Sequence, residues 1–128
     1  MRALLDTHAL LWSLTDDPRL GGLARAFIDD RRNGVLVSVA SLWEMAIKIS
    51  IGKLEVDDTF ERAILDPLAR NNVDTLPIEP RHLVELLALP HHHRDPFDRM
   101  LAAQCGGDHL KIVSADKVFD QYDVERIW

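Results

Sequence analysis

The sequence predicts an α/β protein, a three-layer α/β/α sandwich with a mostly parallel sheet. Two observations carry this prediction. Short β-branched or leucine-rich runs alternate along the chain with longer segments whose apolar residues recur at helical spacing. Apolar residues make up 47% of the chain and charged residues 28%, which is typical of a globular protein and excludes a disordered one. Strands that alternate with helices form a parallel sheet covered on both faces.

The first half of the chain predicts two strands, each followed by helical segments. Residues 3–5 are typical of a buried strand, and the leucines behind them keep helical spacing until Pro18 stops the helix. A second helical pattern covers residues 23–30, and the β-branched run 35–39 predicts the second strand. Ser41 is a suitable N-cap for the next helix. Apolar residues surround that helix on nearly all sides, so we expect it to be largely buried.

The second half repeats the alternation. Residues 58–71 have a helical pattern but include Pro67, so we expect a kink or two separate pieces. Residues 73–78 predict the third strand. The remaining expected elements are a helix from Pro80 to Pro90, a helix over 95–105, a strand at 112–113, a short helix over 117–121 and an edge strand over 124–128.

Composition limits the class of protein. With 128 residues, we expect a single domain over residues 1–128 that buries its own core. The one cysteine, Cys105, excludes an internal disulfide and a thiolate metal cage. A net charge of −6 argues against a general nucleic-acid binder and fits a protein that gathers carboxylates and offsets them with metal ions or a basic partner. No secretory cleavage pattern and no membrane-length apolar run is present, so we expect a soluble, cytoplasmic protein.

Four acidic residues fall near expected carboxyl ends of strands. Asp6 ends the first strand, Asp116 follows the strand at 112–113, and Glu44 and Asp98 lie in the first turns of helices. Each also has a purely structural interpretation. Asp6 and Asp116 are suitable helix caps, Glu44 would complete a capping box with the N-cap of its helix, and Asp98 suits the positive end of its helix.

Taken together, the four acids favour a metal site. A Glu44–Lys48 pair on one helix is worth only about 0.2–0.5 kcal/mol, which is too little to explain a carboxylate on a buried helix. Carboxylates that converge on one edge raise each other's pKa unless a cation binds. Oxygen ligands suit Mg²⁺ or Mn²⁺ rather than Zn²⁺. The run His91–His93 follows Pro90 and predicts a loop rather than a zinc site, since consecutive residues cannot all face one zinc ion.

Four motifs, in this order, resemble a known family: "LLDTHALLW" at 4–12, "SLWEMAIKISIGKL" at 41–54, "HRDPFDRMLAAQ" at 93–104 and "IVSADKVFDQY" at 112–122. They are similar to the PIN-domain ribonucleases, and above all to the VapC-type toxins of prokaryotic toxin–antitoxin systems. The resemblance implies a PIN-like fold and an acidic quartet at Asp6, Glu44, Asp98 and Asp116.

The activity that the resemblance implies is metal-dependent hydrolysis of RNA phosphodiester bonds with Mg²⁺ or Mn²⁺. The three aspartates would hold the ion, and Glu44 would either bind it or orient the attacking water. The groups implied to support them are the hydroxyls of Thr7 and Ser114 and the helix cap Asp95.

Two arginines and three tryptophans raise the question of RNA contacts. Arg94 and Arg99 flank the acids and either contact phosphates or are ordinary solvated charges. Trp12, Trp43 and Trp128 lie among apolar neighbours, so we expect them in the core rather than on a base-stacking surface.

The resemblance also implies partners: an RNA substrate, a small cognate antitoxin and a second copy in a homodimer, with no membrane. Two other functions stay open. An aspartyl phosphotransfer enzyme would use Asp6 as nucleophile, but His8 stands where the second acid of its motif belongs. A non-catalytic interaction module would keep the acidic pocket as a relic, and the presence of all four acids weighs against it.

Overall fold

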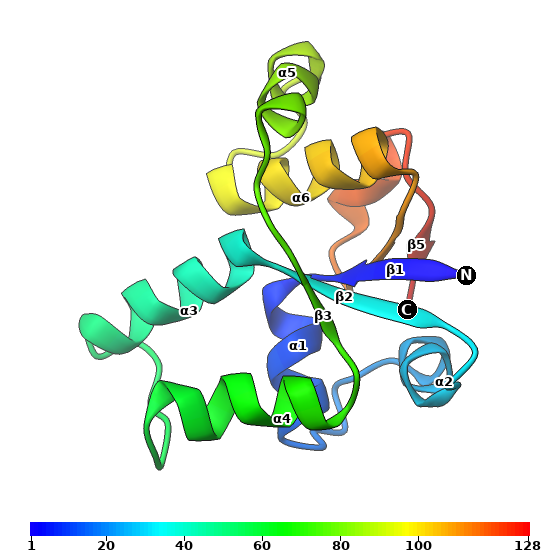
Figure 1. The fold of residues 1–128 in the computed structure, drawn as a ribbon. Coiled ribbons are helices and arrows are strands. Elements are labelled where there is room, and N and C mark those ends of the chain that lie inside the picture. The colour runs from blue at the N-terminus through cyan, green and yellow to red at the C-terminus, as the bar shows by residue number, and fades with distance from the viewer.

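Five short parallel strands form one twisted sheet in the order β3-β2-β1-β4-β5 in the computed structural model, which describes residues 1–128 (Figure 1). All four neighbouring pairs are parallel, so the expected α/β class is confirmed. The strands are β1 Arg2–Leu5, β2 Gly34–Ser38, β3 Asp74–Leu76, β4 Lys111–Val113 and β5 Arg126–Ile127.

Both faces of the sheet are covered, because successive side chains of each strand point to opposite faces. Ala3 and Leu5 of β1 join one core cluster, and Leu4 joins the other. Figure 1 shows α1, α2 and α4 on one side of the sheet and α5 and α6 on the other. The helices are α1 Thr7–Leu14, α2 Gly22–Asp29, α3 Val39–Ser50, α4 Asp66–Arg70, α5 Pro80–Ala88 and α6 Pro96–Asp108. None of them is long and apolar enough to cross a membrane.

Two short helical turns complete the chain. A π-helical turn over Glu61–Leu65 runs directly into α4, where Pro67 occupies the second position. The segment thus consists of a π-helical and an α-helical part that meet without a break, and the change of helix type falls just ahead of Pro67. A 3₁₀ turn over Lys117–Gln121 follows β4, as the short helix predicted there.

The start of α3 differs from the prediction. The helix begins at Val39, and its N-cap is Ser38, whose Oγ accepts the Ala40 N–H at 3.0 Å. The last residue of β2 therefore serves directly as the cap, and no connecting loop lies between strand and helix. Ser41 is buried within the helix, and its Oγ has no hydrogen-bond partner. The predicted Ser41–Glu44 capping box is wrong.

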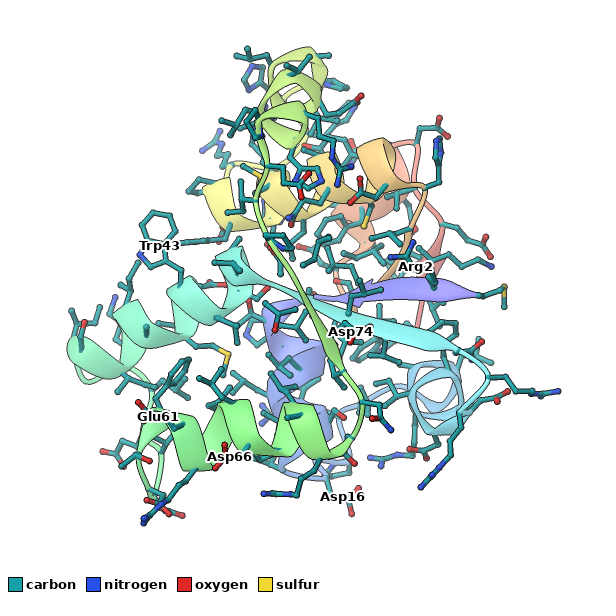
Figure 2. All side chains as sticks on the ribbon, viewed as in Figure 1. Arg2, Asp16, Trp43, Glu61, Asp66 and Asp74 are labelled. Carbon is teal, nitrogen blue, oxygen red and sulfur yellow. The ribbon has the colours of Figure 1, made fainter.

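Helix α3 is also less buried than expected. Its inner face contributes Ala40 and Met45 to the core, but its outer face is exposed, and Trp43 has 59% of its surface in solvent. The Trp43 ring lies edge-on to Phe97 at the start of α6, with 5.3 Å between ring centroids. Figure 2 shows Trp43 on the outer side of α3. Placing Trp43 in the core was wrong, whereas Trp12 and Trp128 pack against the core and each other.

Helix α6 continues past Cys105 through Gly106 and Gly107 and ends at Asp108, followed by His109 in the left-handed region at φ 56°. A Cβ at Gly107 would lie 3.2 Å from Cγ of Glu85 on α5, so the glycine permits close packing of the two helices. The end expected near residue 105 is therefore three residues too early.

Candidate metal centre at the carboxyl edge of the sheet

The central strand β1 delivers Asp6 to the carboxyl edge of the sheet. Asp6 is buried, and its backbone N–H donates to the Val113 carbonyl of β4. Its Oδ1 accepts the Ala9 N–H at 2.8 Å, so it does cap α1. Its Oδ2 accepts the hydroxyl of Ser114, which in turn accepts the Asp116 N–H at 3.0 Å. Ser114 thus joins two of the predicted acids, 110 positions apart in the chain.

The buried carboxylate of Glu44 points toward α1. Its Oε1 accepts the Thr7 hydroxyl at 2.5 Å, and its Oε2 lies 3.2 Å from Nζ of Lys48. The Glu44–Lys48 ion pair considered from the sequence is present. The contact of Glu44 with Thr7 joins helices α3 and α1, so the spacing of residues within one helix could not predict it. Thr7 therefore does lie beside an acid, as the resemblance implied.

Asp98 and Asp116 meet at the side chain of His93. The Nε2 atom of His93 lies 2.8 Å from Oδ2 of Asp116 and 3.1 Å from Oδ2 of Asp98. Each of these three residues offers one ligand atom, and the atoms lie within 4.8 Å of one another. Asp6 and Glu44 fall outside this group. No sequence pattern predicted His93 at this site, because the run His91–His93 indicates a solvated or RNA-facing loop and not a zinc site.

Asp95 is the N-cap of α6, as predicted. Its Oδ1 accepts the N–H groups of Phe97 at 2.8 Å and Asp98 at 3.2 Å. The same carboxylate places a negative charge next to Asp98. Its contribution to the site is therefore both geometric and electrostatic.

The cluster perturbs the titration of its own members. Burial raises the pKa of Asp98 from 3.8 to about 7, the carboxylates of Asp95, Asp6 and Glu44 add to the rise, and His93 opposes it. Burial also raises the pKa of Asp6, against the hydrogen bonds from Ser114 and Ala9, which lower it. Without a cation, a carboxyl group in this site takes up a proton near neutral pH.

The donor chemistry fits a hard divalent cation. Asp98 and Asp116 present carboxylate oxygens toward one point, and the buried carboxylates of Asp6 and Glu44 lie near enough to raise the pKa of Asp98. Oxygen donors of this kind suit Mg²⁺ or Mn²⁺. Lys48 is the only lysine or arginine that forms an ion pair with any of the four acids, so their charge is largely uncompensated.

The two arginines proposed for RNA contacts have different surroundings. The guanidinium of Arg99 donates to the carbonyls of Leu86 at 3.3 Å and Pro90 at 3.0 Å, which ties the loop before α6 to α5. Arg94 is exposed and lines a cavity of about 500 Å³ beside the acids. His93 and Arg99 also line this cavity, and no acidic side chain does.

Comparisons with known proteins agree with this geometry. The PIN domain family matches residues 3–125. Ribonuclease VapC16 of Mycobacterium tuberculosis is 35% identical over 69 residues, which span 51% of this chain and 49% of that protein. The chain thus matches about half the length of this relative.

Two solved structures resemble the whole fold. VapBC2 from Rickettsia felis, bound to a DNA fragment from its promoter, has a TM-score of 0.73 at 12% identity, with 100% of both chains covered. DNA-bound VapBC from Salmonella typhimurium has a TM-score of 0.67 at 17% identity, covering 98% of this chain and 96% of that one. At these identities the likeness concerns the fold.

Proposed function

This chain belongs to the PIN domain family, and on that premise we propose that it is a metal-dependent endoribonuclease that hydrolyses RNA phosphodiester bonds. The observation that carries the proposal is the meeting of Asp98 and Asp116 at one point of the carboxyl edge, with the buried carboxylates of Asp6 and Glu44 near Asp98. Ligands of parallel α/β sheets bind at this edge. The matched segment of a relative named as a ribonuclease supports the same activity.

We assign the cation to Asp98 and Asp116, with Asp6 and Glu44 completing the negative site. A bound Mg²⁺ or Mn²⁺ would polarise the scissile phosphate and acidify a water. Asp6 keeps its orientation through Ala9 and Ser114. Glu44 either binds the ion or orients the water, and Thr7 and Lys48 hold its two oxygens in place for either role.

The cavity lined by Arg94 is the proposed path for RNA phosphates. It adjoins the acids through His93, and its lining carries N–H donors but no carboxylate. Phosphate contacts of this kind position a nucleic acid without reading its sequence. Arg99 contributes by holding the loop that carries Arg94, since its guanidinium binds backbone carbonyls.

The contacts of Asp6 disfavour the phosphotransfer alternative. Only 5% of its surface is exposed, and both its oxygens accept hydrogen bonds. An aspartyl nucleophile needs an oxygen that can reach an incoming phosphorus atom. The non-catalytic alternative predicts no RNA cleavage under any condition.

The test is cleavage of a single-stranded RNA with Mn²⁺ or Mg²⁺, with p-nitrophenyl phosphate hydrolysis measured in parallel. We expect RNA cleavage that stops with excess EDTA and returns with excess metal, and no phosphatase activity. Cleavage that persists after exhaustive chelation would contradict metal-dependent hydrolysis. Phosphatase activity without RNA cleavage would favour the phosphotransfer enzyme.

We further propose that a small antitoxin inhibits this enzyme and that the chain forms a homodimer. The acidic edge is complementary to an Arg or Lys side chain, which would compete with the metal. Exposed apolar side chains on α5, among them Leu83, Val84 and Leu87, offer area for association. Light scattering of the chain alone tests the homodimer, and a monomer would contradict it. For the antitoxin, the chain is mixed with the protein of a neighbouring small reading frame, and RNA cleavage by the complex is measured. A stoichiometric complex with full activity would contradict inhibition.

A further inference from the structure

His93 is held at four points, although it lies in the loop between α5 and α6. Its backbone N–H donates to the Tyr122 hydroxyl at 2.9 Å, and its ring packs on Phe119. On one edge of the ring, Nδ1 accepts the Asp95 N–H at 3.1 Å. On the other edge, Nε2 faces Asp98 and Asp116. The orientation of the imidazole is therefore determined by the surrounding structure.

The contact with Asp95 determines which ring nitrogen carries the proton. A backbone N–H can only donate, so Nδ1 must present its lone pair. The neutral ring then carries its proton on Nε2, which donates to the two carboxylates. Histidines that bind metals show the opposite arrangement, in which the second nitrogen donates its N–H to an acceptor. In this conformation His93 has no lone pair to offer to a cation.

The same N–H occupies the carboxylate oxygens that a cation needs. Asp116 uses Oδ1 to accept the Val118 N–H at 2.9 Å, which leaves Oδ2 as its oxygen without a backbone partner. That oxygen lies 2.8 Å from Nε2 of His93. A cation that joined Asp116 and Asp98 through their Oδ2 atoms would meet the imidazole N–H.

We propose that His93 is a positioning residue that holds Asp98 and Asp116 together in the metal-free protein and competes with the cation for them. Binding of the ion then requires the ring to leave the carboxylates. His93 lies beside Arg94 and lines the same cavity, so a movement of the ring away from the carboxylates would change the wall of that cavity. This inference rests on the proposed function, which supplies the cation.

The test is the affinity of the metal-free protein for Mn²⁺, measured by titration calorimetry without RNA. His93→Asn and His93→Gln form a matched pair, since both are neutral amides. The shorter Asn keeps an acceptor near the Asp95 N–H but cannot reach the acids, whereas Gln places an N–H near them. We expect His93→Asn to bind Mn²⁺ about tenfold more tightly than the wild type, and His93→Gln to stay within about threefold of it.

His91→Asn is the control, because His91 is an exposed histidine of the same loop, and it should bind Mn²⁺ like the wild type. His93→Ala, checked by circular dichroism, replaces His93→Asn if the latter does not fold. Weaker binding by His93→Asn would identify the ring as a ligand and overturn the inference while leaving the metal site in place. Equal binding by all forms would also overturn it. Absence of Mn²⁺ binding in every form, wild type included, would refute the proposed function and the inference with it.

Discussion

Asp116→Asn is expected to lower the rate of RNA cleavage by about 100-fold or more while leaving the fold intact. The asparagine keeps an oxygen that can accept the Val118 N–H, so the cap of the 3₁₀ turn survives. Its amide nitrogen replaces the second oxygen, which removes the negative charge and the proposed ligand. The measurement is a single-turnover cleavage rate in saturating Mn²⁺, with circular dichroism of both proteins.

The matched control is Asp123→Asn, the same chemical change at an exposed position six residues after the 3₁₀ turn begins. It should cleave RNA like the wild type. Asp98→Asn should lose activity to a similar extent, because Asp98 faces the same point. Equal rates for Asp116→Asn and Asp123→Asn would show that Asp116 is only a helix cap.

The second prediction concerns the contribution of Asp98 to the free energy of unfolding of the metal-free protein, which should fall as the pH rises from about 4 to about 7. Burial, followed by the neighbouring carboxylates, raises the pKa of Asp98 from 3.8 to about 7. In this pH range the folded state binds a proton that the unfolded state has released. The stability that this proton provides is complete below pH 4 and lost as the pH passes 7, and it amounts to at most about 4 kcal/mol.

Chemical denaturation at several pH values, for wild type and Asp98→Asn, isolates this contribution. The two curves should converge below about pH 4, and the variant should be the more stable protein at pH 7.5. Mn²⁺ should then stabilise the wild type at pH 7.5, by about 2.7 kcal/mol at a hundred times its Kd, and the variant less. Parallel pH curves, or the same Mn²⁺ response in both proteins, would mean that Asp98 only begins a helix.

Local chemistry was sufficient to predict the order of the elements and the position of the acids along them. The helix around Pro67 changes type just ahead of the proline, which lacks the backbone N–H that a regular helix would use. Asp95 caps α6 because its carboxylate needs only the N–H groups two and three residues ahead. Asp6 and Asp116 follow strands that can be predicted from their own apolar residues, without knowledge of the neighbouring strands. In each case the deciding contact lies within a few residues.

The tertiary structure alone decided which of these groups meet. Ser38 displaces Ser41 as cap because β2 runs into α3 without a loop. Trp43 stays exposed because the inner face of α3 packs against its neighbours, α1 and α6, while its outer face meets solvent. The spacing of the histidine run gave no sign that His93 would join Asp98 and Asp116. That contact spans 23 residues and depends on β4 lying next to β1 and on the loop after α5 folding back over them. Periodicity and capping report the local backbone, whereas a site at a sheet edge is created by the packing of segments that are distant in the chain.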